Sequence, residues 1–246
     1  MNLQLIVPAL YTTLARVYHE IYPYIFDYEN EFDFYNSVFQ KFHCHKILEI
    51  ACGTGILAKY LIRAGYDYLG VDLNEEMLNV AREANPTGKF LQGDMRNLKI
   101  TDEFDATLIA GKSVTHLLTN TDIFSSLRGI RKILRPGGIV MFDAYDANAE
   151  FGEWIDEGEQ EVSADGKLYR IRGKYTKLLD TGWTARWQLT YTLPDSDQIV
   201  DTMDIRSYTM DEIRLFLTLV PFDVKVVEKF TDNVFIAIGQ KIQGQE

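Results

Sequence analysis

The feature that most constrains the fold of this chain is an alternation of short apolar segments with amphipathic ones. The apolar segments are bounded by turn residues, and the segments between them carry apolar residues at helical spacing. This pattern predicts strands at 46–50, 68–72, 89–91, 104–110 and 139–145, and helices at 56–63, 75–83 and 121–134. Short strands separated by helices form βαβ units, so we predict an α/β fold with a Rossmann-like, doubly wound and mostly parallel sheet.

Two regions depart from this alternation. Residues 1–42 are rich in tyrosine and phenylalanine and are predicted to form a helical lid that breaks at Pro23. Residues 151–205 contain a long stretch of period-2 alternation rich in Tyr, Trp and Thr, which predicts an inserted antiparallel β meander on the substrate side.

The α/β pattern resumes near the C-terminus. A helix over 210–219 begins with a capping box from Thr209 to Glu212, and strands at 222–230 and 234–239 are joined by a short turn. These strands would complete a seven-stranded sheet with an antiparallel hairpin. We therefore expect residues 1–150 and 206–246 to form one domain, interrupted by the insertion at 151–205.

The most informative stretch for function is Glu49-Ile50-Ala51-Cys52-Gly53-Thr54-Gly55, which leaves a predicted strand and enters a predicted helix. Glycines at this point let a ligand approach the backbone beside the positive end of a helix. Asp72 ends the next strand, where a carboxylate can accept hydrogen bonds from both ribose hydroxyls. With Ala58 the motif has the form G-x-G-x-x-A, so these residues alone are compatible with NAD and with S-adenosylmethionine.

Three further features favour S-adenosylmethionine. The Glu49 carboxylate would not stabilise an anionic pyrophosphate, but it would stabilise a ligand that carries an ammonium and a sulfonium. Asp94 follows the third strand in Gly93-Asp94-Met95, where it can accept from an adenine amine, and Leu134-Arg135-Pro136-Gly137-Gly138 precedes the fifth strand. Together, over about Lys46 to Tyr145, these motifs resemble the class I S-adenosylmethionine-dependent methyltransferases.

That resemblance implies a set of cofactor-binding residues along one edge of the sheet. They are Glu49, Ala51, Gly53, Gly55, Asp72, Leu73, Met77, Asp94, Met95 and Ala110. It also implies S-adenosyl-L-methionine as the cofactor and methyl transfer by in-line displacement, in which the protein mainly aligns the nucleophile with the methyl group.

The flanking segments are similar to those of small-molecule N-methyltransferases, which include amino-sugar dimethyltransferases and glycine or sarcosine methyltransferases. The likeness rests on the tyrosine-rich start from Tyr18 to Tyr28, on Ser113-Val114-Thr115-His116-Leu117, and on the meander followed by Arg206-Ser207-Tyr208-Thr209. It implies an amine acceptor, with His116 and Tyr18 as catalytic candidates and Tyr22, Tyr28 and Arg206 as substrate-binding candidates. His116 is equally compatible with a packing role, and most of the N-terminal aromatic residues should pack in the core.

Several other functions remain as alternatives. The acceptor could be an oxygen or a macromolecule, and the chain could be an NAD-dependent oxidoreductase or a protein that binds the cofactor without transferring methyl. Ala110-Gly111-Lys112-Ser113 stands where enzymes that methylate base or glutamine nitrogens usually carry a Pro-Pro run, which argues against that chemistry.

The composition and charge of the chain limit the kinds of binding partner that we expect. The net charge is −11 without any run of Lys and Arg, so we expect no nucleic-acid partner. The chain shows no export signal and no apolar run long enough to span a membrane, which favours a cytoplasmic location. His43-Cys44-His45 lacks a second ligand cluster, so we expect no metal. The sequence does not indicate an oligomeric state.

Overall fold

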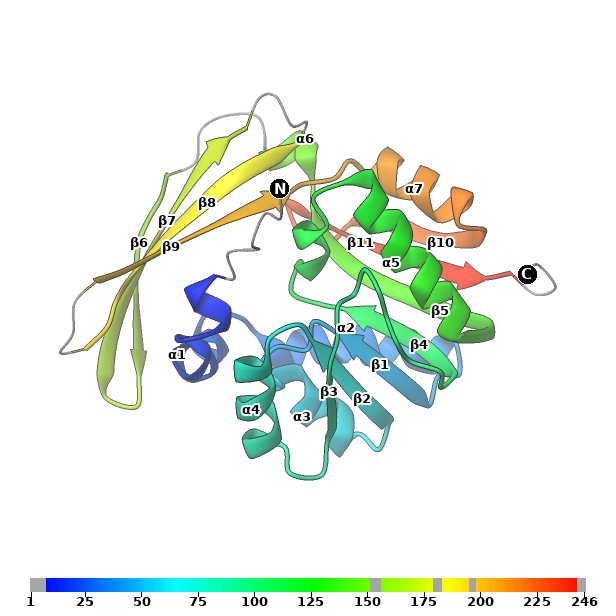
Figure 1. Cartoon of the computed structure of the whole chain (residues 1–246), viewed down its shortest axis with the longest axis horizontal. Helices are drawn as coiled ribbons and strands as arrows, with labels where there is room; N and C mark the ends of the chain where they lie inside the picture. The colour runs from blue at the N-terminus through cyan, green and yellow to red at the C-terminus, as the bar shows by residue number, and fades with distance from the viewer. Residues whose placement is uncertain (1–7, 151–155, 179–182, 195–197, 243–246) are drawn as a thin grey trace.

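The computed structural model describes residues 8–150, 156–178, 183–194 and 198–242, and it arranges them around two β-sheets (Figure 1). The larger sheet has seven strands in the order β10-β11-β5-β4-β1-β2-β3, and the smaller sheet has four in the order β6-β7-β8-β9. Helices cover both faces of the larger sheet. The smaller sheet is separate from it, and the first N-terminal helix, α1 (Ala15–Ile21), lies between the two. This arrangement confirms the predicted fold class.

The larger sheet follows the predicted alternation closely. Its parallel strands are β1 (Lys46–Ile50), β2 (Asp67–Asp72), β3 (Lys89–Gln92), β4 (Phe104–Ile109) and β5 (Leu134–Tyr145), connected by α3 (Ile56–Arg63), α4 (Glu75–Ala84) and, after the short η3 turn (Ser113–His116), α5 (Asn120–Ile133). The C-terminal part adds α7 (Met210–Leu219), β10 (Phe222–Lys229) and β11 (Val234–Lys241), and β11 pairs antiparallel with both β10 and β5. The short α6 helix (Ala147–Glu150) follows β5.

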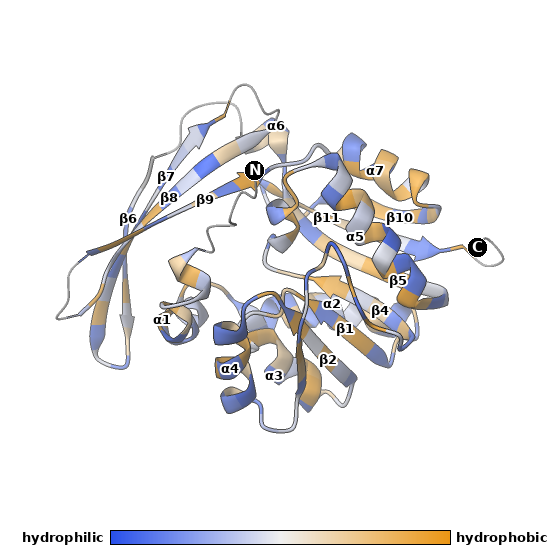
Figure 2. Ribbon diagram, in the orientation of Figure 1, coloured by the Kyte–Doolittle hydropathy of each residue, from blue (hydrophilic) through white to orange (hydrophobic). Residues whose placement is uncertain are grey.

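The strands read as apolar runs because both faces of the larger sheet are buried. One face packs against α5 and α7 through residues such as Ile130 and Leu217, and the other packs against α2 and α3 through residues such as Phe39 and Leu61. Figure 2 shows the hydrophobic residues gathered along these strands and on the helix faces turned toward them. This core holds the carboxyl ends of β1, β2 and β4 in fixed positions.

The N-terminal helices divide between the core and the smaller sheet. They are η1 (Ala9–Tyr11), α1 (Ala15–Ile21), η2 (Tyr22–Tyr24) and α2 (Tyr28–Lys41). The helical break occurs at η2, which contains Pro23, and Asp27 caps α2 by accepting a hydrogen bond from the Asn30 N–H at 3.1 Å. Tyr35 and Phe39 of α2 are buried against the larger sheet. The part of residues 8–42 that stands over the carboxyl edge therefore extends from the N-terminal turn to the start of α2, where Tyr28 and Glu31 line the cavity described below.

The smaller sheet is antiparallel throughout. Its strands are β6 (Asp156–Ala164), β7 (Lys167–Lys177), β8 (Thr184–Thr192) and β9 (Gln198–Arg206). Apolar side chains of β8 and β9 pack against Leu10 and Leu14 of the N-terminal segment. The predicted alternation identified β7, β8 and β9; β6 was not recognised as a strand because its sequence is acidic and it forms an edge.

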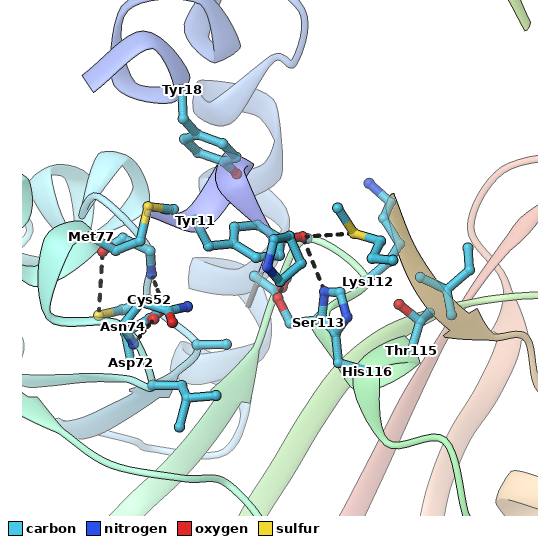
Figure 3. Close-up of a pocket in the computed structure, with 18 of the residues that line it drawn as sticks. Tyr11, Tyr18, Cys52, Asp72, Asn74, Met77, Lys112, Ser113, Thr115 and His116 are labelled. Atoms are coloured by element: carbon cyan, nitrogen blue, oxygen red, sulfur yellow. Dashed lines mark hydrogen bonds between the residues drawn. The ribbon is translucent and has the colours of Figure 1, made fainter. Parts of the chain in front are cut away.

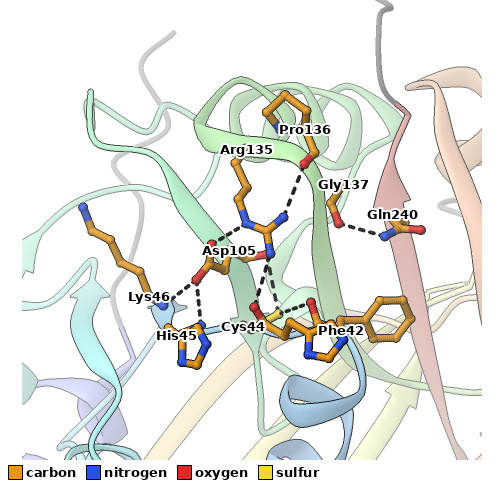
Figure 4. A network of polar contacts seen from close by, with 10 residues as sticks. Phe42, Cys44, His45, Lys46, Asp105, Arg135, Pro136, Gly137 and Gln240 are labelled. Atoms are coloured by element: carbon orange, nitrogen blue, oxygen red, sulfur yellow. Dashed lines mark hydrogen bonds and ion pairs between the residues drawn. The ribbon is translucent and has the colours of Figure 1, made fainter.

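A polar network connects the strands of the larger sheet at the starts of β1, β4 and β5, at the end of the sheet opposite the carboxyl ends of its parallel strands (Figure 4). The Asp105 carboxylate accepts hydrogen bonds from the backbone N–H groups of His45 at 2.7 Å and Lys46 at 2.8 Å, and it pairs with Arg135. Arg135 belongs to the predicted turn 134–138, which the structure incorporates into β5 as an irregular start. The motif around His43 thus lies in a structural contact, and the described residues contain no group of three or more potential metal ligands.

Candidate functional site

A cavity of about 980 Å³ opens at the carboxyl ends of the parallel strands, which is where open α/β sheets bind ligands. Its floor comes from the ends of β1, β2 and β4, and its other walls come from the N-terminal segment and β9.

No helix among the described residues is long and apolar enough to cross a membrane.

The glycine turn after β1 depends on left-handed backbone conformations. Gly53 has φ +54° and Gly55 has φ +72°, which glycine adopts without a steric penalty, and Ala51 is also left-handed at φ +58°. The Gly53 N–H donates to Oδ2 of Asp72 at 2.9 Å. The turn and the end of β2 therefore form one rigid wall of the cavity.

Asp72 is the central acid of this wall. It is 7% exposed, and its second oxygen accepts from the Asn74 N–H at 2.9 Å. Burial raises the pKa of Asp72, while its backbone hydrogen bonds act in the opposite direction. Each carboxylate oxygen has a further lone pair, so Asp72 can also accept from hydroxyls of a ligand.

Glu49 is more deeply desolvated. It is 3% exposed and accepts a hydrogen bond of 2.5 Å from the Tyr68 hydroxyl. Burial raises the pKa of Glu49 to about 8; the Tyr68 hydrogen bond acts against the rise, and the charge of Asp72 adds to it. At pH 7 the carboxyl is therefore mostly protonated, and a cationic ligand group would favour its ionised form.

Asp94 lines the cavity farther along the edge, but its carboxylate already has a partner. Both of its oxygens contact Arg96, with a shortest distance of 2.6 Å. A ligand amine at this position would meet an ion pair instead of a lone carboxylate.

The opposite wall contains a tyrosine that the sequence reasoning did not select. Figure 3 shows Tyr11 reaching from the N-terminal turn toward His116, with Asp72, Asn74 and Met77 on the other side of the cavity. The Tyr11 hydroxyl lies 3.1 Å from Nε2 of His116 and 3.8 Å from Sδ of Met203. Burial lowers the pKa of His116 to about 4 and raises the pKa of Tyr11 well above its usual value. The imidazole and the phenol are thus both neutral at pH 7, and we assign the hydroxyl as the donor to Nε2.

Four aromatic side chains continue this wall. Tyr18 and Tyr22 are stacked with their ring centroids 3.6 Å apart, and Phe26 lies 5.6 Å from Tyr22 and 6.4 Å from Tyr28. All four line the cavity. Such rings present electron-rich faces to a cationic ligand group.

The structure brings most of the predicted site residues together around this cavity. Those that line it are Tyr18, Tyr22, Tyr28, Glu49, Ala51, Gly53, Asp72, Leu73, Met77, Asp94, Met95, Ala110 and His116. Two do not. Gly55 lies behind the turn against Asn85, and Arg206 is paired with Glu212 at 3.2 Å, where it stabilises the start of α7.

The residues that sequence reasoning missed come mainly from the N-terminal turn and β9. They include Tyr11, Asp201 and Met203. Tyr11 had no distinguishing signal, because it is one aromatic residue among many in a predicted helical region.

Comparison with known proteins shows that this chain is similar to methyltransferases. Residues 47–138 match the family model described as "Methyltransferase domain". The chain is 27% identical over 150 residues to a dTDP-3-amino-3,4,6-trideoxy-alpha-D-glucopyranose N,N-dimethyltransferase of Streptomyces venezuelae, which covers 61% of each chain. It is 32% identical over 142 residues to a glycine/sarcosine N-methyltransferase of Parasynechococcus marenigrum (strain WH8102), covering 54% of this chain and 50% of the relative.

The fold has a close counterpart among solved structures. An S-adenosylmethionine-dependent methyltransferase from Clostridium acetobutylicum superimposes with a TM-score of 0.76 at 19% identity, covering 94% of this chain and 98% of that one. The two curated relatives match over only 61% and 50% of their own lengths, which is less than two thirds. These matches confirm the resemblance to S-adenosylmethionine-dependent methyltransferases that the sequence motifs indicated.

Proposed function

We propose that this chain, which carries a methyltransferase domain in the fold of S-adenosylmethionine-dependent methyltransferases, transfers a methyl group from S-adenosylmethionine to a small amine. One observation carries the proposal. The glycine turn with Asp72 and Glu49 opens into the same cavity as the Tyr11–His116 pair, so a cofactor site and a polar pair capable of proton transfer adjoin each other.

The residues around β1 and β2 fit S-adenosylmethionine. Asp72 would accept from the ribose hydroxyls, Leu73 and Met95 would contact the adenine, and Glu49 would face the methionine ammonium. When bound, the cofactor supplies a methyl group on a sulfonium that is already activated as a leaving group. NAD is less suitable because its pyrophosphate would gain no stabilisation from Glu49, the buried acid before the glycine turn.

The acceptor would occupy the part of the cavity between His116 and β9. Parallel strands β2 and β3 lie on the cofactor side of β1, whereas β4 and β5 lie on the other side, and η3 follows β4. The relative from Streptomyces venezuelae is named for an amino-sugar acceptor, which supports an amine here. We include in this proposal that the smaller sheet covers the acceptor.

An amine must be neutral to attack the methyl group, and Tyr11 and His116 can take its proton. Burial in this cavity disfavours an ammonium as it disfavours an imidazolium, so a bound protonated amine would deliver its proton to the Tyr11 oxygen while the phenol proton passes to Nε2 of His116. The in-line displacement then forms the nitrogen–carbon bond and breaks the carbon–sulfur bond. Tyr18 would help to exclude water and hold the reacting groups in place.

Replacement of the polar pair should lower turnover without a matching loss of cofactor affinity. We expect His116→Ala and Tyr11→Phe each to reduce kcat at pH 7 about 100-fold, the lower end of the usual contribution of general base catalysis. The defects should shrink toward pH 9, where more of the amine is already neutral. Since the pKa of His116 is about 4, the wild-type rate should show no acid limb from this residue near pH 6.5.

The measurement is a pH–rate series with a panel of amines that includes glycine, sarcosine and a dTDP-linked 3-amino sugar, with Tyr18→Phe as a comparison. Unchanged rates in the His116 and Tyr11 variants would remove the proposed proton route and leave the cofactor site standing. If an alcohol but no amine in the panel is methylated, the alternative of an oxygen acceptor is correct.

Cofactor binding should release a proton through Glu49. The pKa of Glu49 is about 8 in the free protein, so an ammonium beside it should drive ionisation at pH 7 and release up to about one proton. Calorimetry of S-adenosylhomocysteine binding in phosphate and in Tris would detect the release as a buffer-dependent heat. Glu49→Gln should abolish the dependence. A buffer-independent heat in the wild type would place the ammonium elsewhere.

A further inference from the structure

The N-terminal turn that carries Tyr11 is tied to the smaller sheet by a buried carboxylate. One oxygen of Asp201 accepts from the Leu10 N–H at 2.7 Å, and the other accepts from the Thr202 N–H at 2.9 Å. Asp201 is only 6% exposed, and 191 residues separate it from Leu10 along the chain. Because a buried carboxylate is costly unless it is hydrogen-bonded, this site favours the state in which the turn is docked.

Apolar packing also holds the same turn against the smaller sheet. Leu10 and Leu14 are each 2% exposed and pack against side chains of β8 and β9, including Leu189 and Met203. The turn has no side-chain cap of its own at its N-terminus. Its position is therefore set by contacts with the sheet.

Tyr11 follows Leu10 directly, so the tie also determines where the phenol lies. Its hydroxyl reaches His116 at 3.1 Å and Met203 at 3.8 Å. The strand β9 thus contacts the turn at two points, through the Asp201 carboxylate on the backbone and through the Met203 sulfur on the Tyr11 hydroxyl. Movement of the backbone at Leu10 would separate Tyr11 from His116.

The lid helix depends on the same turn. α1 begins four residues after Tyr11, and Ala15 packs against Met77 and Val80 of α4, beside the proposed cofactor pocket. On the outer surface Arg16 pairs with Glu83 at 2.8 Å, an exposed contact that contributes little to stability. The buried tie at Asp201 is the stronger restraint on the start of the lid.

We infer that Asp201 is a positioning residue that latches the N-terminal lid to the smaller sheet and thereby places Tyr11 against His116. The catalytic consequence rests on the proposed methyl transfer, whereas the latch itself does not. An aspartate suits this role because both of its oxygens accept from backbone N–H groups. An asparagine at the same position has one acceptor oxygen, so its amide NH2 group would face one of those two backbone donors.

Hydrogen exchange tests the latch without any activity. We expect amides 10–18 to exchange at least about tenfold faster in Asp201→Asn and Asp201→Ala, with the central strands unchanged, because only a local opening becomes easier. Glu161→Gln is the matched control, since Glu161 lies on β6 of the same sheet in an exposed pair with Arg170. Wild-type exchange at 10–18 in both variants would overturn the inference. So would equal acceleration throughout the protein, which indicates global destabilisation.

Release of S-adenosylhomocysteine tests whether the latch acts through the turn. Stopped-flow release should be about tenfold faster in Asp201→Asn than in the wild type, and the same substitution should add less than about twofold in a Tyr11→Ala background. Fully additive effects would show that Asp201 acts independently of the turn and would contradict the inference. If the wild-type protein does not bind S-adenosylhomocysteine at all, the proposed function fails, and hydrogen exchange still decides the latch.

Discussion

Asp72→Ala is expected to weaken the binding of S-adenosylhomocysteine by about 2–4 kcal/mol, which is a factor of roughly 30 to 1,000 in Kd. The substitution removes two charge-assisted hydrogen bonds to the ribose. It also removes the acceptor for the Gly53 and Asn74 N–H groups, so the glycine turn loses its contact with the end of β2. Titration calorimetry on the folded variant measures the effect.

A control at the other end of β2 distinguishes a loss of the binding site from a general effect of replacing an aspartate on this strand. Asp67 begins β2, and its exposed side chain pairs with Lys89 at 3.3 Å. Asp67→Ala should leave the affinity within about twofold of the wild type, because exposed pairs contribute little and the residue lies far from the carboxyl edge. An unchanged affinity in Asp72→Ala, or tight binding of NAD by the wild type, would contradict the proposed cofactor site.

Gly55→Ala is expected to lower the free energy of unfolding by about 3–4 kcal/mol. Gly55 has φ +72°, a conformation that costs alanine energy. An added Cβ would also lie 2.8 Å from Nδ2 of Asn85 and 3.1 Å from Cβ of Ala81. Asn85 cannot move freely, because the same Nδ2 donates to the Gly55 and Ala81 carbonyls in a buried setting.

The matched control is a second left-handed glycine with open space around it. Gly65 has φ +88°, and an added Cβ would meet nothing within 4 Å. Gly65→Ala should therefore cost only the backbone term, about 1–2 kcal/mol. Urea unfolding followed by circular dichroism gives both values. Equal losses in the two variants would show that the packing against Asn85 is not what requires glycine at position 55.

Prediction from sequence succeeded where the signal is local. The strand at 46–50 and the helix at 56–63 have the predicted bounds, because a buried parallel strand is apolar throughout and a helix on a sheet shows one apolar face. The positions of Glu49, Asp72 and Ala110 at one edge follow from the same reasoning. Once the strands are parallel, their carboxyl ends meet.

Prediction was incomplete where the role of a residue or strand depends on a partner distant in the sequence. β6 has the sequence DEGEQEVSA, and it is a strand because its backbone pairs with β7 while much of it faces solvent. Arg206 looked like a substrate residue, yet the capping box of α7 places Glu212 beside it. Gly55 was expected to bind the cofactor, but it is not among the residues that line the cavity, and Asn85, 30 residues away in the chain, donates a hydrogen bond to its carbonyl.

The sequence by itself determined the sheet, the glycine turn and the acids that line it, since each depends on periodicity or on residues close in the chain. Only the tertiary structure decided that Tyr11 meets His116 across 105 residues and that Asp201 holds Leu10 across 191. Periodicity reports which face of a segment is buried, but it carries no information about which distant segment covers that face. That choice depends on how the N-terminal turn packs between the two sheets, and it places the Tyr11–His116 pair beside the proposed cofactor site.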